Sequence, residues 1–350
     1  MRPYAGFVEY PSVEVDSAEI VASVLNGKAP GLTVRTAGST GTPRHVRIGS
    51  KALEASATAG LERLGGPGSW LLALPHDRIA GINVWARAHV GGKEVVVMEP
   101  GPFQPERFIP YAQTTLRLPG RHYVSLVPTQ VRRLVKNPDA CALLDEFDAV
   151  LVGGAALDSE DRRLNVVESY GMTETTGGCV FDGVPLDGVD VAVDSHGLIF
   201  IGGDTLADGY VDGNNDGFTT LRNRRYFATK DVGALAPDLT IVGRADTVII
   251  TGGINVYPEK VAGALRALEY ITEACVVPIP DVEWGHTVAA VVVTTHAVPP
   301  SLEEVRHDLA HTLEPHERPR HIAWVERLPM LESGKIDHEA AVAIATGAGG

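Results

Sequence analysis

Short apolar segments alternate with helix-like segments between Leu32 and Ile241. The apolar segments include SWLLALP, KEVVVME, HYVSLVP and FDAVLVGG, and helix-like segments such as SKALEASATAGLERL and PTQVRRLVK lie between or beside them. Strands that alternate with helices are typical of crossover units, in which consecutive strands run parallel. The pattern therefore predicts an α/β fold with a mostly parallel sheet covered by helices on both faces.

The character of the sequence changes after Gly202 and again after Gly243. The stretch GGDTLADGYVDGNNDGF is rich in Gly and Asp, which predicts tight turns in an antiparallel region. A second pattern of two helices, three strands and a final helix follows, and 350 residues are enough for two domains. We expect a large N-terminal domain (1–243) of mixed and parallel sheets with an antiparallel subdomain, and a small α+β domain (247–350).

The composition of the chain limits the kinds of molecule that it can be expected to bind and where it can be expected to occur. The formal net charge of -14 argues against non-specific binding to nucleic acid or to an anionic membrane. The three cysteines are far apart in sequence, which favours reduced thiols over a disulfide framework. The N-terminus has no apolar segment typical of a signal peptide, and the longest apolar run is too short to span a bilayer. We therefore expect a cytoplasmic protein without nucleic-acid or membrane partners.

The stretch VRTAGSTGTPRHVRI combines small, hydroxylated and basic residues. It lacks the pattern of a P-loop, and Pro43 interrupts the helix that a nucleophile elbow would need. A strand–loop–strand hairpin fits better, and its backbone N–H groups and hydroxyls would face a phosphate chain. An ordinary hairpin loop is the alternative. The candidate phosphate-binding residues are Thr36, Gly38, Ser39, Thr40, Gly41, Thr42 and Arg44.

Five motifs in order resemble the adenylate-forming acyl-CoA synthetase superfamily. They are TAGSTGTPR, ESYGMTETTGG, YFATKDVG, the segment from Gly243 to Val261, and LPMLESGKID. The resemblance implies that a carboxylate attacks the α-phosphorus of ATP, and that the thiol of CoA then displaces AMP from the acyl-adenylate. The chain departs from the usual motifs at Arg44, where the family has Lys, and at Lys230, where it has Gly.

The resemblance assigns nucleotide-binding roles to residues from several motifs. Thr173 would offer its hydroxyl to phosphate, and Glu174 would offer a carboxylate oxygen to Mg²⁺. A helix first-turn acid is the alternative for Glu174. Asp231 and Arg244 would bind the ribose hydroxyls. The adenine would lie against Gly154 and Ala155 with Tyr170 on its other side, and Gly171 and Met172 would also belong to the ATP site.

The remaining family positions concern the small domain. Lys335 matches the lysine that bridges the carboxylate and the α-phosphate during adenylation, and a solvated surface lysine is the alternative. Asp246 matches the hinge about which the small domain rotates. Gly252 and Gly253 resemble the segment that lets the pantetheine of CoA pass close to the backbone. The small domain is therefore expected to be mobile and to present different faces in the two half-reactions.

Two further stretches, GGPGSWLLALPHDRIAG and GGCVFDGVPLDGV, together with the compact length, resemble the actinobacterial o-succinylbenzoyl-CoA synthetases of menaquinone synthesis. Their substrate has two carboxylates, so the acyl pocket needs a cation beyond those that serve ATP. Arg87 is the first candidate and Arg78 the second, and a surface salt bridge is the alternative for Arg87. Gly81 would leave room for the aromatic ring, and Thr176 and Gly177 would line the same wall.

The sequence leaves other functions open. A ligase for another aryl acid or a fatty acid, or a nucleotide-binding regulatory module with a degraded site, would share many of these motifs. The function favoured by the resemblance is that of an ATP-dependent CoA ligase for 2-succinylbenzoate. It implies ATP, CoA and 2-succinylbenzoate as small-molecule partners and Mg²⁺ as cofactor, with a homodimer possible. The retention of Thr173, Glu174, Asp231, Arg244 and Lys335 together argues against the degraded module.

Overall fold

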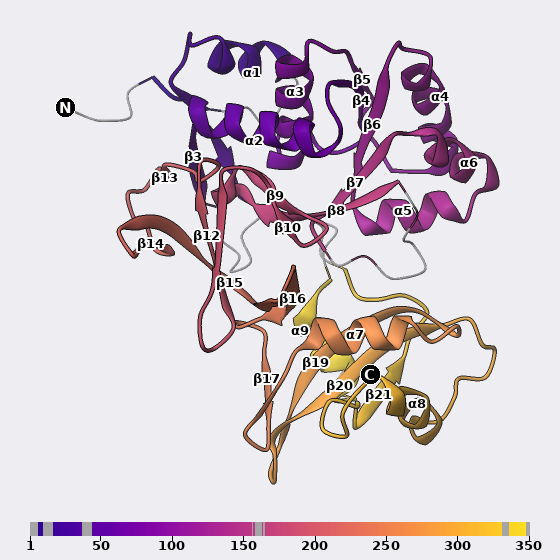
Figure 1. The fold of residues 1–350 in the computed structure, drawn as a ribbon. Helices are drawn as coiled ribbons and strands as arrows, with labels where there is room; N and C mark the ends of the chain where they lie inside the picture. Colours follow the sequence, from indigo (N-terminus) through magenta and orange to yellow (C-terminus); the bar gives the residue numbers. More distant parts are fainter. Residues whose placement is uncertain are drawn as a thin grey trace.

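The structure is a computed structural model that describes residues 6–9, 17–36, 44–155, 157, 163, 165–330 and 336–347. In Figure 1 the elements up to about β16 form one large body, and the elements that follow form a smaller one below it. None of the helices in the described part of the chain combines the length and the apolar character needed to cross a bilayer.

A seven-stranded sheet forms the centre of the large body. Its order is β10 (Val184–Pro185), β9 (Gly177–Phe181), β8 (Val166–Met172), β7 (Ala149–Gly153), β6 (Arg121–Leu126), β4 (Gly68–Leu72) and β5 (Val95–Val97). The strands from β8 to β5 are parallel, whereas β9 runs antiparallel to β8 and to β10. The α/β class with a mostly parallel sheet is therefore confirmed.

Side chains that alternate along these strands are buried on opposite faces of the sheet, as the pleat requires. Leu71, Val124 and Val150 belong to a cluster under α4 (Pro105–Leu116), α5 (Pro128–Val135) and α6 (Pro138–Glu146). Their neighbours Trp70, Tyr123 and Ala149 belong to a cluster under α2 (Ser50–Arg63) and α3 (Ile79–Gly91). Helices on both faces explain why the strands read as nearly continuous apolar runs.

Two smaller sheets complete the large body. The first contains β1 (Val8–Glu9), β2 (Gly31–Arg35), β3 (His45–Gly49) and β13 (Gly209–Tyr210), and α1 (Ser17–Leu25) packs against it. The second is antiparallel and contains β11 (Val189–Val193), β12 (Leu198–Gly203), β15 (Arg224–Leu235), β14 (Phe218–Leu221) and β16 (Leu239–Arg244). The second sheet is the antiparallel region expected from the Gly/Asp-rich stretch.

The smaller body is built around a mixed sheet. It contains β18 (Ile254–Val256), β17 (Ile249–Thr251), β20 (Gly285–Thr294), β19 (Ile271–Asp281) and β21 (His321–Trp324). The helices are α7 (Pro258–Arg266), α8 (Leu302–Asp308) with the 3₁₀ turn η3 (Leu309–His311), and α9 (His338–Ala345). The two apolar clusters of the smaller body contain only residues from Ile249 onward.

Candidate active site

The strand–loop–strand motif of the phosphate loop is present. β2 and β3 pair antiparallel, the N–H of Thr36 donates to the carbonyl of Arg44 at 2.7 Å, and the N–H of Arg44 donates to Thr36 Oγ1 at 3.1 Å. A strand, and not a helix, follows the loop, which excludes the nucleophile elbow. The other loop residues predicted to bind phosphate lie outside the described residues, namely Gly38, Ser39, Thr40, Gly41 and Thr42.

Arg44 and Glu174 meet at a residue that sequence reasoning missed, Tyr210. The hydroxyl of Tyr210 donates to Glu174 Oε1 at 2.7 Å, and Arg44 Cζ lies 3.3 Å from the centroid of the Tyr210 ring. Arg44 also pairs with Asp212 at 3.3 Å. We call these four residues the Tyr210 cluster. A lone tyrosine among turn residues, in ADGYVDG, was the available sequence signal.

Glu174 is presented by a short 3₁₀ turn, η2 (Thr173–Thr175), which begins directly after β8. Thr175 fixes this turn, because its hydroxyl donates to carbonyl groups and accepts the N–H of Met172 at 2.9 Å. The N–H of Ala207 donates to the carbonyl of Glu174 at 2.9 Å. Thr173 and Glu174 are both partly exposed, as a site for an incoming ligand requires.

A second group of predicted residues forms a connected chain of polar side chains. Tyr170 donates its hydroxyl to Asp231 Oδ2 at 2.8 Å, and Arg244 donates to Asp231 Oδ1 at 3.2 Å. Arg244 also makes two hydrogen bonds of 2.9 Å to Asp246, and Lys230 Nζ lies 3.2 Å from the same carboxylate. We call these five residues the Asp231 network. Four of its members were predicted as site residues, and they come from three different sequence motifs. The fifth, Lys230, was noted only as a departure from the family.

Burial and neighbouring charges shift the pKa values of three side chains of the Asp231 network. Burial, reinforced by Asp231, raises the pKa of Tyr170, so its hydroxyl stays protonated and donates. Hydrogen bonding to Asp246 raises the pKa of Arg244. Burial alone would raise the pKa of Asp246, but Arg244 and Lys230 outweigh it and hold that pKa below its ordinary value. The carboxylate of Asp246 therefore remains ionised at neutral pH.

The residues expected around adenine lie at the ends of adjacent strands. β7 pairs with β8 so that Gly153 is opposite Ser169, which places Gly154 and Ala155 beside the strand that carries Tyr170. Gly154 has a φ of 88°, a conformation that favours glycine. At Gly171 a Cβ atom would lie 2.1 Å from the carbonyl oxygen of Gly177, so the hairpin of β8 and β9 requires glycine there. Met172 ends β8 and packs against an apolar cluster.

Arg87, the first candidate for the acyl pocket, is buried to 2 % exposure on α3. Its Cζ lies 5.5 Å from the Trp70 ring centroid and 5.8 Å from that of Phe181. No carboxylate pairs with it among the described residues, and Nε has no hydrogen-bond partner there. Burial lowers the pKa of Arg87 from 12.5 to about 10, so the side chain is a cation at neutral pH. A surface salt bridge is therefore excluded.

Gly60 on α2 provides the space that Arg87 occupies. A Cβ atom at Gly60 would lie 2.9 Å from Arg87 Nε. Glycine inside a helix costs about 1 kcal/mol relative to alanine, so a specific contact explains its presence in the middle of α2. The two helices that cover this face of the sheet are thus packed around a buried cation.

The other acyl-pocket candidates lie on or near the same helix. Gly177 is needed because a Cβ atom there would lie 2.2 Å from Asn83 Nδ2, and Asn83 donates to the carbonyl of Thr176 at 2.7 Å. The hydroxyl of the fully buried Thr176 has no partner among the described residues. Gly81 would bring a Cβ atom within 2.4 Å of the Pro75 carbonyl, which gives a backbone reason for this glycine. Arg78 precedes α3, is part-exposed and lies 3.7 Å from Asp77.

The predicted residues of the small body are separated from these clusters in sequence. Gly252 and Gly253 form the turn between β17 and β18, with φ of 57° and 81°. Gly252 donates its N–H to the carbonyl of Trp284 at 3.0 Å, and a Cβ atom would lie 2.6 Å from the Trp284 ring. Lys335 lies outside the described residues.

The side chains present fit a divalent cation held jointly with a ligand. Within the described ranges, no group of three or more His, Cys, Asp or Glu residues could hold a metal ion by itself. Glu174 accepts the Tyr210 hydroxyl on Oε1, and Oε2 accepts no hydrogen bond from the described residues. Mg²⁺ commonly takes one or two carboxylate oxygens together with substrate phosphates. A single carboxylate beside a predicted phosphate loop matches that donor set.

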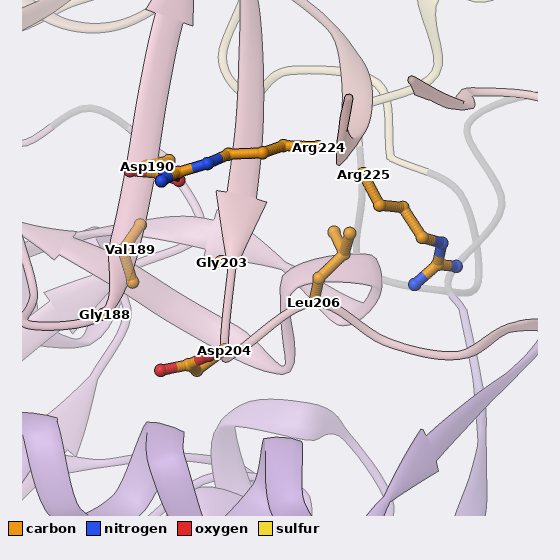
Figure 2. A pocket seen from close by; sticks show the side chains of 8 residues that line it. All are labelled: Gly188, Val189, Asp190, Gly203, Asp204, Leu206, Arg224 and Arg225. Atoms are coloured by element: carbon orange, nitrogen blue, oxygen red, sulfur yellow. Dashed lines mark hydrogen bonds and ion pairs between the residues drawn. The ribbon is translucent and has the colours of Figure 1, made fainter. Parts of the chain in front are cut away.

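A cavity of about 660 Å³ lies elsewhere, against the antiparallel sheet of β11 and β12 (Figure 2). Its lining residues are Gly188, Val189, Asp190, Gly203, Asp204, Leu206, Arg224 and Arg225. None of these residues was predicted to contact a substrate. Arg224 pairs with Asp190 at 2.8 Å, and Arg225 donates to the carbonyls of Ala207 and Asp208. The polar groups of this cavity are thus largely satisfied within the protein.

Comparison with known protein families shows to which family the chain belongs. The sequence model of AMP-binding enzymes matches residues 34–211, and the model of the AMP-binding enzyme C-terminal domain matches residues 260–335. The chain belongs to the AMP-binding enzyme family. The first match includes the phosphate loop and the Tyr210 cluster as far as Val211, and the second begins in α7 and ends at Lys335.

Individual members of this family are similar over most of the chain. A probable 2-succinylbenzoate–CoA ligase of Mycobacterium tuberculosis is 42% identical over 322 residues, which are 89% of this chain and 83% of the relative. The 2-succinylbenzoate–CoA ligase of Escherichia coli is 29% identical, over 86% of this chain and 65% of the relative.

Solved structures share the fold. The o-succinylbenzoate CoA synthetase of Bacillus subtilis, in complex with its acyl-adenylate intermediate, superimposes with a TM-score of 0.74 at 23% identity. That match covers 89% of this chain and 68% of the other. ATP-bound MatB of Rhodopseudomonas palustris gives a TM-score of 0.76 at 23% identity, over 90% of this chain and 68% of the other. The adenylate-forming ligase architecture expected from the motifs is confirmed.

Proposed function

We propose that this chain is an ATP-dependent 2-succinylbenzoate–CoA ligase of menaquinone biosynthesis. The reaction converts the acid, ATP and CoA to 2-succinylbenzoyl-CoA, AMP and pyrophosphate through an acyl-adenylate. Support comes from the relative in M. tuberculosis, which bears this name and aligns over 83% of its length. The E. coli relative and the B. subtilis structure bear the same substrate in their names.

In the first half-reaction, a carboxylate oxygen of the acid attacks the α-phosphorus of ATP and pyrophosphate leaves. Thr173, Arg44 and the loop hydroxyls hold the phosphates, while Asp231 and Arg244 hold the ribose. Gly154, Ala155 and Tyr170 flank the adenine, and Lys335 bridges the attacking carboxylate and the α-phosphate. Glu174 would hold Mg²⁺, which would supply positive charge to the leaving pyrophosphate when bound. The protein acts mainly by positioning and by stabilising charge on phosphorus.

In the second half-reaction, the thiol of CoA attacks the acyl carbon and AMP leaves. We assign residues 247–350 to a small domain that rotates about Asp246 between the two steps, with 1–243 as the large domain. The separate apolar clusters of the smaller body support this division. The turn at Gly252 and Gly253 would then face the pantetheine, because glycine allows close approach to the backbone.

The burial of Arg87 is the observation on which the choice of substrate rests. A fully buried guanidinium without a carboxylate partner among the described residues is unfavourable unless a ligand supplies the anion. 2-Succinylbenzoate has a second carboxylate that is not activated and can play this part. A fatty acid would leave Arg87 uncompensated. Thr176, whose buried hydroxyl is free among the described residues, offers a further hydrogen bond.

A pyrophosphate-release assay with 2-succinylbenzoate, ATP and Mg²⁺ tests this function, with benzoate and a fatty acid as comparison substrates. We expect rapid release with 2-succinylbenzoate and CoA, and little with the monocarboxylic acids. Turnover with benzoate or a fatty acid, but none with 2-succinylbenzoate, would reject the substrate assignment. No turnover with any acid would favour the nucleotide-binding module instead.

The proposed partners are the three small molecules alone. The net charge of -14 supports the absence of nucleic-acid and membrane partners, and a cytoplasmic location fits this chemistry. A homodimer is compatible with the same assignment. Analytical ultracentrifugation of the purified chain measures its oligomeric state directly.

A further inference from the structure

Tyr210 lies between two side chains that the proposed function assigns to ATP and its metal. β13 pairs with β3 so that Tyr210 is opposite Val46, two residues from Arg44. The N–H of Val211 donates to the carbonyl of His45 at 2.9 Å and extends this pairing toward Arg44. The aromatic ring therefore lies beneath the Arg44 guanidinium, while its hydroxyl reaches Glu174.

The surroundings of Tyr210 fix its position. Its side chain is 4 % exposed, and its ring meets that of Phe218 edge to face with centroids 5.7 Å apart. The N–H of Tyr210 donates to Asn215 Oδ1 at 3.1 Å. A rigid, buried ring can hold two mobile side chains at lower entropic cost than another flexible residue could, because little freedom remains to be lost.

The charges around Tyr210 determine what its hydroxyl and its ring can do. Burial, together with Glu174, raises the pKa of Tyr210, so the phenol remains a donor at physiological pH. The bond of 2.7 Å to Oε1 is a charge-assisted hydrogen bond and leaves Oε2 available. Arg44 stacks on the electron-rich face of the same ring, as cations prefer, and donates to the carbonyl of Asn214.

We propose that Tyr210 is a positioning residue for adenylation. Through its hydroxyl it holds the Glu174 carboxylate in one orientation for a divalent cation, and through its ring it holds Arg44 for the phosphates of ATP. This inference rests on the proposed function, because it requires Glu174 and Arg44 to meet ATP and Mg²⁺. It predicts that the hydroxyl and the ring have separable effects.

Two variants separate the effects. Tyr210→Phe removes only the hydroxyl, and Tyr210→Leu removes the ring as well. The binding probe is α,β-methylene-ATP, measured by calorimetry with Mg²⁺ and again in EDTA, so that no turnover is needed. For Tyr210→Phe we expect affinity to fall about tenfold with Mg²⁺ and less than about twofold in EDTA, the size of one charge-assisted hydrogen bond. Tyr210→Leu should weaken binding under both conditions.

Tyr123→Phe is a matched control. The Tyr123 hydroxyl is also buried and donates to the carbonyls of Leu64 and Gly66 at 2.9 Å, in a part of the large sheet away from the Tyr210 cluster. Its loss should lower thermal stability and leave the Mg²⁺ dependence of binding unchanged. In the pyrophosphate assay, Tyr210→Phe should raise the half-saturating Mg²⁺ concentration about tenfold, with the KM for 2-succinylbenzoate unchanged.

A double-mutant cycle with Glu174→Gln tests whether Tyr210 acts through that carboxylate. If it does, adding Tyr210→Phe to Glu174→Gln should change the Mg²⁺ dependence by less than about twofold. Full additivity, or a folded Tyr210→Phe protein with wild-type Mg²⁺ dependence, would overturn the inference while the ligase function stands. Failure of the wild-type protein to adenylate any acid would instead reject the proposed function. Should Tyr210→Leu not fold, Arg44→Met probes the cation supported by the ring.

Discussion

The Asp231 network and Arg87 differ in whether their charged side chains have partners of opposite charge. In the network each ionised side chain has an opposite charge within 3.2 Å, and Asp231, the most buried of them, accepts from both Tyr170 and Arg244. Arg87 is more deeply buried, yet no carboxylate among the described residues pairs with it. The charges of the network are compensated within the protein, whereas we propose that the second carboxylate of the substrate compensates Arg87.

The difference indicates what each region can bind. A compensated network can offer hydrogen bonds to a neutral group, such as ribose hydroxyls, without needing added charge. An uncompensated buried cation lowers the stability of the free protein, and the lowered pKa of Arg87 corresponds to roughly 3 kcal/mol at neutral pH. A bound anion would recover part of that free energy. On the proposed function, Arg87 would thus lower the stability of the free protein and favour a substrate with a second anionic group.

Asp231→Asn should have the largest effect. An amide replaces one of the two acceptor oxygens with a donor NH2 group, so fewer lone pairs are left to accept the ribose hydroxyls, and the ionic pairing with Arg244 is lost as well. We expect the affinity for α,β-methylene-ATP to fall about 100-fold, equivalent to the loss of one or two charged hydrogen bonds. The KM for 2-succinylbenzoate should change little. Calorimetry and steady-state kinetics measure both quantities.

Asp190→Asn is the control for this substitution. Asp190 also pairs with an arginine, Arg224, at 2.8 Å, but both side chains are well exposed. An exposed pair of this kind contributes little, so nucleotide affinity should remain at the wild-type level. If Asp190→Asn and Asp231→Asn weaken binding equally, the distinction between a compensated site and ordinary surface pairs is wrong.

Arg87→Met should produce opposite changes in stability and substrate binding. Removing an uncompensated buried charge in favour of an apolar chain of similar length should raise the free energy of unfolding by about 1–3 kcal/mol. The KM for 2-succinylbenzoate should rise about 10- to 100-fold, while the KM for ATP stays constant. Chemical denaturation and kinetics on the same preparation give both numbers.

Arg63→Met provides the matched comparison for Arg87→Met. Arg63 ends α2 and donates to the carbonyls of Val184 and Pro185 near the protein surface. Its loss should lower stability slightly and change neither KM value. If Arg87→Met also lowers stability, the cation–π contacts with Trp70 and Phe181 compensate the guanidinium, and the contrast with the Asp231 network disappears.

Much of this architecture could be predicted, because the signals for it are local. The runs around Trp70, Val96, Val124 and Val150 became β4, β5, β6 and β7, since apolar runs between helices are typical of buried parallel strands. The second helix of the pattern after Gly243, predicted from SLEEVRHDLAHTL (301–313), ends earlier than its sequence indicates, because α8 gives way to the 3₁₀ turn η3 at Leu309. Only the end of that element was missed, where helices commonly tighten.

The site was less predictable where contacts join distant segments. The motifs indicated Glu174 and Arg44, but Tyr210 reaches both only because β13 pairs with β3, which no local pattern indicates. Gly81 was interpreted as space for an aromatic ring, whereas the close approach of the Pro75 carbonyl already requires glycine there. Lys230 was noted as a departure from the family, and its contact with Asp246 emerges only from the folded chain.

Lys230→Met should have the smallest effect, because Arg244 keeps two hydrogen bonds to Asp246 when Lys230 is lost. Since the folded-state pKa of Asp246 is depressed, the pairing contributes stability above the unfolded pKa of about 3.9 and loses it as the pH falls through the folded-state value. Both partners are substantially exposed, so the loss in unfolding free energy at neutral pH should stay below about 1 kcal/mol. The difference between variant and wild type should shrink in about 1 M salt and in acid. A difference that persists under both conditions would mean that Lys230 stabilises the chain by packing, and that Arg244 alone compensates Asp246.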